Sequence, residues 1–154
     1  MTVTDYFDSS ALVKRYLAEI GSTWVQARCG DPAHVIVIAD LARAEIAAAF
    51  ARKLREGAIS RAEYLAARKK LADDVQQRFQ VIPVTPQRID EAIELTANRP
   101  LRGYDAVHLA CALHANRMLS ANNLPELTLI AADGVLLQAA EAEGMHTENP
   151  NSHP

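Results

Sequence analysis

The chain has 154 residues, of which 49% are hydrophobic and 23% are charged. This length corresponds to one domain of ordinary size, and the hydrophobic share is enough to fill its core. The formal net charge of −3 argues against a protein that holds nucleic acid mainly by bulk positive charge. The longest uninterrupted apolar run, Ile46–Ala51, has six residues, whereas a membrane-spanning helix needs about 20.

The beginning of the chain shows no basic stretch followed by an apolar block, so we expect no signal peptide and no membrane segment. Cys29 and Cys111 are the only cysteines, and two such distant residues do not form a disulfide framework. A reducing, cytoplasmic location is the simplest expectation.

The first part of the chain alternates short apolar runs with helical patterns. We expect a strand at Val3–Asp8 that runs directly into a helix at about Ser10–Glu19. Gly21 and Ser22 then separate this helix from another at about Thr23–Cys29. The β-branched run at residues 34–39 is typical of a buried strand.

Two long helices form the middle of the predicted fold. The first spans about Leu41–Glu56 and ends at Gly57, and the second begins with the capping box Ser60–Glu63 and runs to about Gln77. The link between them is short, which predicts an antiparallel αα-hairpin at about residues 41–78. Residues 43–78 carry a net charge of +4, while the rest of the chain carries −7.

The second half again alternates strands and helices. The expected strands are Phe79–Val84, Leu127–Ala132 and the short Met145–Thr147, and the expected helices start at Thr85-Pro86, Asp105 and Val135. The helix at about Asp105–Asn116 is apolar nearly all round and is therefore expected to be buried.

This alternation predicts an α/β fold with a parallel central sheet sandwiched between helices. We expect one domain at residues 1–148 and a flexible C-terminal tail at residues 149–154. In such sheets, ligands bind beyond the carboxyl ends of the strands.

Acidic residues stand at those strand ends and in two other unusual places. Asp8 follows the first predicted strand and Asp133 follows the fourth, although helix capping would explain either one alone. Glu45 lies in an otherwise small and apolar helical segment, and Asp105 begins the buried helix. If the four carboxylates converge, a cation must neutralise them, and oxygen ligands favour Mg²⁺ or Mn²⁺. Such an ion would support hydrolysis of phosphodiester bonds.

Several motifs resemble those of PIN-domain proteins, in particular the VapC toxins of type II toxin–antitoxin systems. They cover nearly the whole chain in the family's order: Asp5–Tyr16, Leu41–Glu45, Leu101–Ala110, Leu129–Asp133 and the end from Glu143 to Pro150. The resemblance implies a PIN-like fold and a metal-dependent endoribonuclease that acts as the toxin of such a pair.

The resemblance also implies roles for individual residues. Asp8 and Asp105 would be the main metal ligands, Glu45 would complete the site directly or through water, and Asp133 would be the fourth acid. Ser9 stands where the family commonly has a small hydroxyl residue. The implied partners are a second copy of the chain, an RNA substrate and a small VapB-like antitoxin that inserts a basic side chain among the acids.

A second hypothesis is a catalytically inactive PIN-fold module that docks a basic peptide or RNA. Ala131 and Gly134 support this alternative, because the family often has a hydroxyl residue and a basic residue at these positions. They also leave the role of Asp133 and the presence of a second metal ion open. The apolar face of the αα-hairpin is expected to form the dimer contact or the antitoxin groove.

Basic residues near the motifs have two interpretations. Six of them in the hairpin would either contact RNA phosphates or form a solvated helix face: Arg52, Lys53, Arg55, Arg68, Lys69 and Lys70. Arg102, three positions before Asp105, would either hold the scissile phosphate or neutralise the acids without metal.

One further pattern on the buried helix, His108, Cys111 and His114, allows a zinc site in principle. The two histidines are six positions apart rather than four, so histidines with their hydrogen bonds satisfied inside a buried helix are the better interpretation.

Overall fold

The computed structural model describes residues 2–154 and contains one five-stranded parallel sheet. The strand order is β3-β2-β1-β4-β5, and every neighbouring pair is parallel. The strands are β1 (Val3–Phe7), β2 (His34–Ala39), β3 (Gln80–Ile82), β4 (Thr128–Ile130) and β5 (His146–Glu148). The expected α/β fold with a parallel central sheet is therefore confirmed.

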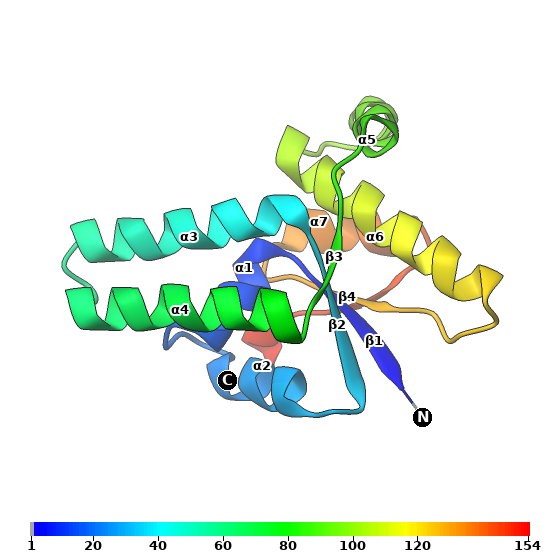
Figure 1. The fold of residues 1–154 in the computed structure, drawn as a ribbon. Coiled ribbons are helices and arrows are strands. Elements are labelled where there is room, and N and C mark those ends of the chain that lie inside the picture. The colour runs from blue at the N-terminus through cyan, green and yellow to red at the C-terminus, as the bar shows by residue number, and fades with distance from the viewer. Residues whose placement is uncertain (1) are drawn as a thin grey trace.

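Helices cover both faces of this sheet (Figure 1). They are α1 (Ser9–Leu12), α2 (Ser22–Gly30), α3 (Asp40–Arg55), α4 (Arg61–Gln77), α5 (Pro86–Asn98), α6 (Gly103–Ala121) and α7 (Gly134–Ala142). Helices α3 and α4 lie side by side and extend beyond the sheet, so the expected αα-hairpin is present (Figure 1). The Ser60–Glu63 capping box forms as predicted at the start of α4.

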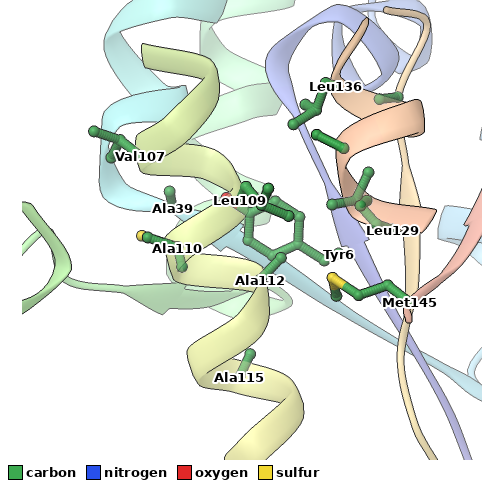
Figure 2. Close-up of a cluster of buried hydrophobic side chains, with 14 of the residues drawn as sticks. Tyr6, Ala39, Val107, Leu109, Ala110, Ala112, Ala115, Leu129, Leu136 and Met145 are labelled. Atoms are coloured by element: carbon green, nitrogen blue, oxygen red, sulfur yellow. The ribbon is translucent and has the colours of Figure 1, made fainter. Parts of the chain in front are cut away.

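Two hydrophobic cores fill the space between the sheet and the helices because successive strand residues point to opposite faces. Tyr6 of β1 belongs to the core beneath α6 and α7, and the next residue, Phe7, belongs to the core beneath the hairpin. Figure 2 shows Tyr6 enclosed by Leu109 and Ala112 of α6 and by Leu129 of β4. Both aromatic side chains are fully buried, which fixes the end of β1 in place.

The first helix is shorter than the sequence predicted. In place of one helix over about Ser10–Glu19, α1 ends at Leu12 and a 3₁₀ turn continues to Arg15. The reason is a tertiary contact: Arg15 forms an ion pair of 2.8 Å with Asp74 of α4, and the hydroxyl of Tyr16 donates to the same carboxylate. These buried contacts outweigh local helix propensity.

Other boundaries differ by smaller amounts. Helix α6 begins at Gly103 and continues to Ala121, five residues beyond its expected end, and β3 has three residues rather than the expected six. Strand β3 has a neighbour on one side only, which limits how far its pairing extends.

The last residues of the chain pack against α2 and form a 3₁₀ turn at Pro150–Ser152. The ring of His153 stacks on Trp24 with 4.5 Å between centroids, and Pro150 is buried. A Cβ atom at Gly21, where φ is +86°, would lie 2.4 Å from the carbonyl oxygen of Pro150. The division into a domain at residues 1–148 and a flexible tail stays a prediction, but the tail has specific contacts.

A search of residues 2–154 finds no helix that is long and apolar enough to cross a membrane.

Candidate active site

The structure places all six candidate site residues around one cleft of about 550 Å³. Asp8 directly follows β1, Ser9 begins α1, and Glu45 lies on α3. Arg102 directly precedes α6, Asp105 lies in the first turn of α6, and Asp133 lies between β4 and α7. The parallel sheet explains this convergence, because β1 and β4 are neighbours and both end at the same edge. The individual roles of these residues stay proposals.

Asp8 is held in place by its own helix. Its two carboxylate oxygens accept hydrogen bonds of 2.7 and 2.8 Å from the hydroxyl of Ser10, and Oδ1 also accepts one from the backbone N–H of Ala11. The Ser10 hydroxyl in turn accepts from the backbone N–H of Ala132, which follows β4. Asp8 therefore caps α1, as expected, and it also lines the cleft.

The Asp8 carboxyl is buried, and this burial raises its pKa to about 6. The neighbouring His108, the Ser10 hydroxyl and the Ala11 amide act in the opposite direction but do not cancel the effect of burial. A carboxylate in this state gains more from a bound cation than an exposed one does.

Glu45 on α3 is tied to two other elements. Its Oε1 atom accepts a 2.7 Å hydrogen bond from the hydroxyl of Ser9 and lies 2.6 Å from Nε2 of His108 on α6. Burial raises the pKa of Glu45, but the contacts with His108 and Ser9 outweigh this effect, and the pKa lies below its ordinary value. Glu45 is therefore ionised and points toward the same region as Asp8.

His108 has a defined tautomer because of its second neighbour, Tyr6. The hydroxyl of Tyr6 lies 2.8 Å from Nδ1 of His108, and burial raises the pKa of Tyr6 well above its ordinary value, so the hydroxyl keeps its proton. This hydroxyl has no other hydrogen-bond acceptor within residues 2–154, so it donates to Nδ1. The Nε2–H group of His108 then donates to Glu45.

Arg102 bridges the two remaining acids. Its guanidinium lies 3.2 Å from Oδ2 of Asp105 and 3.3 Å from Oδ2 of Asp133, and it stacks 4.7 Å above the ring of Tyr104. Burial raises the pKa of Asp105, and Arg102 opposes this shift. Asp133 also caps α7 through a 3.0 Å hydrogen bond from the backbone N–H of Val135. In this conformation, Arg102 acts as a cation that neutralises the acids.

The donor atoms of the cleft are chemically suited to a hard divalent cation, since they are carboxylate oxygens and include the buried, high-pKa Asp8. In their present rotamers, however, the acids bond to Ser10, Ser9, His108 and Arg102. Among residues 2–154, no three His, Cys, Asp or Glu side chains are arranged to bind one metal ion together. A metal ion bound in this cleft would require these side chains to rotate, and the roles of Asp8, Glu45 and Asp105 as its ligands stay proposals.

Sequence reasoning missed three residues that build this site. Tyr6 and Ser10 orient other side chains, and His108 was interpreted only as a core histidine. The available signal was the position of His108, one helical turn after Asp105, which puts both residues on one face of α6.

The zinc alternative on α6 finds no support. His108 is hydrogen-bonded to Tyr6 and Glu45, and Cys111 is a buried free thiol. His108 is thus a satisfied histidine, as expected, but its partner is a cleft residue.

Solved structures with this fold share little sequence with the chain. The protein PAE2754 of Pyrobaculum aerophilum is 20% identical, with a TM-score of 0.63, and the match covers 99% of this chain and 93% of that one. The toxin VapC20 of Mycobacterium tuberculosis, described as cleaving the sarcin–ricin loop, is 15% identical, with a TM-score of 0.60 and coverages of 88% and 94%. A toxin–antitoxin complex of Klebsiella pneumoniae contains a chain that is 18% identical, with a TM-score of 0.53 and coverages of 84% and 86%.

A comparison with curated proteins gives no sequence match. The sequence profile of the PIN domain, in contrast, matches residues 6–144, which include the end of β1, the hairpin, and the four acids of the cleft. The match spans most of the chain and agrees with both the strand order and the motifs that suggested this family. The chain therefore belongs to the PIN domain family.

Proposed function

We propose that this protein is a metal-dependent endoribonuclease and the toxin of a toxin–antitoxin pair. One observation carries the proposal: four acids from four separate segments, Asp8, Glu45, Asp105 and Asp133, line a single cleft at the carboxyl edge of the sheet. Membership in the PIN family supports it, as do the related folds of an RNA-cleaving toxin and of a toxin–antitoxin complex.

Asp8, Asp105 and Glu45 would hold a Mg²⁺ or Mn²⁺ ion, with Asp133 as a further acid. When bound, such an ion supplies an activated water and neutralises charge on the phosphate oxygens. The chain itself supplies orientation: Ser10 fixes Asp8, while His108 and Ser9 fix Glu45. Arg102 would have to leave Asp105 and Asp133 for these acids to act as metal ligands, and its guanidinium would then be free to contact the scissile phosphate.

Cellular RNA is the proposed substrate and the cytoplasm the proposed site of action. We further propose a small VapB-like antitoxin that places a basic side chain where Arg102 now lies, and a homodimer. Large apolar side chains that a partner could cover are exposed at Leu65 on the hairpin and at Ile89 and Ile93 on α5. The surface of α5 is thus a second candidate for the dimer contact besides the hairpin.

The experiment is cleavage of a pool of cellular RNAs by the purified protein in Mg²⁺, in Mn²⁺ and in EDTA. An Asp105→Asn variant with unchanged circular dichroism serves as the control. Cuts at defined sites that vanish in EDTA and in the variant are the expected result. Equal cutting by parent and variant would contradict the proposed site.

A catalytically inactive binding module is the second candidate, and the pairing of every acid with a protein group favours it. In that case calorimetry would show no Mn²⁺ binding by the folded protein, and the protein would not cut RNA in the presence of any metal ion.

A further inference from the structure

The cleft has a basic wall as well as acids. Lys14, in the 3₁₀ turn after α1, and Arg52, near the end of α3, both line it, and α1 packs directly against α3. Neither residue belongs to the acidic site described above.

Lys14 is unusual because its side chain is 93% buried, with only 7% of its surface exposed. Its single ionic partner is Glu19, at 3.9 Å, which is too long for a hydrogen bond, and the ammonium donates no hydrogen bond within residues 2–154. A lysine can bury its apolar stem while its ammonium keeps contact with water, and the Lys14 ammonium is not among the buried side-chain atoms that lack a partner in residues 2–154. The enclosed stem also keeps the ammonium from moving away, so the charge is held at the cleft wall.

Arg52 is the second cation on this wall. Its side chain forms neither an ion pair nor a hydrogen bond with any of residues 2–154. Several other basic residues of the hairpin do have local partners: Arg43 pairs with Asp40, Lys69 with Asp73, and Arg68 bonds to Tyr64. Arg55 and Arg61 also have no such partner within residues 2–154 but line neither cavity, so Arg52 is distinguished by its place on the wall of the cleft.

A second groove of about 390 Å³ continues this wall along the hairpin. Glu19 lines both cavities, and the groove adds Lys53 from α3 and Lys70 from α4. Lysines that line a groove are suited to contact the phosphates of a single strand.

We propose that Lys14 and Arg52 form a phosphate-binding subsite for the RNA backbone next to the scissile bond, extended by Lys53 and Lys70. The subsite rests on the proposed nuclease function. Its physical purpose is to offset the acids: a polyanion approaching Asp8 and Asp105 is repelled unless fixed cations lie nearby. Since phosphate contacts carry no sequence information, this subsite sets affinity and strand direction.

The test uses Asp8→Asn protein, so that binding is measured without cleavage, and a fluorescent single-stranded RNA of 12 nucleotides in Mg²⁺. Fluorescence anisotropy is recorded over a series of KCl concentrations. Lys14→Gln and Arg52→Gln should each weaken binding roughly tenfold and reduce the salt slope of log K by about 0.7, the value for one phosphate contact. Glu19→Gln should strengthen binding, because it frees the Lys14 ammonium.

Lys69→Gln is the matched control: it removes the same charge from α4 but lines neither cavity. Equal losses for Lys14→Gln and Lys69→Gln would overturn the subsite and leave only a general charge effect. Binding of RNA that is unchanged by Lys14→Gln and Arg52→Gln would overturn it as well. Cleavage by the parent protein, measured separately, decides the nuclease function, so the two failures are distinguishable.

Discussion

The Nε2 atom of His108 lies 2.6 Å from Oε1 of Glu45, which joins the buried helix α6 to the first half of α3. The other ring nitrogen accepts from the fully buried Tyr6, so a residue at the end of β1 determines which nitrogen of His108 carries the proton. Three elements thus fix the direction of one carboxylate in the cleft.

Tyr6→Phe tests this arrangement with the loss of a single oxygen. Without the hydroxyl, Nδ1 of His108 is left unpaired, and the ring is free to adopt the tautomer that cannot donate to Glu45. We expect weaker Mn²⁺ binding in calorimetry and about tenfold slower cleavage, with a loss of about 1 kcal/mol in the free energy of unfolding. Tyr64→Phe is the control, because this half-buried tyrosine of α4 accepts its hydrogen bond from Arg68 and does not line the cleft. An unchanged Mn²⁺ affinity in Tyr6→Phe would show that the hydroxyl does not act through Glu45.

Asp8 makes the metal-free protein sensitive to pH. Its pKa is about 6 in the folded protein and near 3.8 when unperturbed, so the folded state binds the proton more tightly. This group alone therefore stabilises the fold as pH falls from about 7 to about 4 and costs stability above pH 6. Asp8→Asn removes the buried charge, and in EDTA at pH 7.5 it should raise the free energy of unfolding by about 1–3 kcal/mol.

The advantage of the asparagine variant should shrink as pH falls below 6 and disappear below pH 3.8, where the parent carboxyl is protonated in both the folded and the unfolded state. Thermal unfolding of both proteins across this pH range measures the effect. Parallel curves for the two proteins would contradict the raised pKa of Asp8. At pH 7.5, added Mn²⁺ should make the parent protein more stable than the Asp8→Asn variant, because the ion binds to the parent.

Arg102→Gln tests the cation that bridges Asp105 and Asp133. The guanidinium competes with a metal ion for the same carboxylates, so its removal should tighten Mn²⁺ binding by about three- to tenfold, a Coulomb effect reduced by the 65% exposure of Arg102. Cleavage should nevertheless slow, because the proposed phosphate contact is lost. Arg99→Gln, whose partner is Glu143, is the control for charge. If Arg102→Gln weakens Mn²⁺ binding, the guanidinium supports the metal site rather than competing with it.

Asp74 anchors the hairpin to the turn after α1. Burial raises the pKa of Asp74, but hydrogen bonds from Arg15 and Tyr16 outweigh it, and its pKa lies below the ordinary value. This contribution to stability is present above about pH 4 and is lost as pH falls through the lowered pKa. Asp74→Ala leaves the Arg15 charge buried and should cost about 3–5 kcal/mol at pH 7 in chemical unfolding.

Two variants separate the charge of Asp74 from its shape. Asp74→Asn should recover only a small part of the loss, since an amide oxygen still accepts one hydrogen bond but does not pair with Arg15. Asp73→Ala removes the neighbouring, exposed acid, which pairs only with Lys69, and should change stability by less than about 1 kcal/mol. A similar cost for Asp73→Ala and Asp74→Ala would contradict the anchoring role.

Local rules predicted much of this fold from the sequence. The capping box at Ser60, the N-cap with proline at Thr85-Pro86, and the β-branched run of β2 act within a few residues, and all three appear where expected. The predicted length of the helix after β1 is wrong, because the contact of Arg15 with Asp74, 59 positions later in the chain, decides where this helix ends.

The sequence by itself determined the alternation of strands and helices, hence the parallel sheet, and it placed Asp8 and Asp133 at one edge because parallel strands end together. Only the tertiary structure decided the partners of each acid: Ser10 for Asp8, His108 for Glu45 and Arg102 for the other two. The physical reason is that the two kinds of interaction act over different separations in the sequence. Capping and strand periodicity depend on neighbours in the chain, whereas side-chain hydrogen bonds between residues 6, 45 and 108 depend on how separate elements pack.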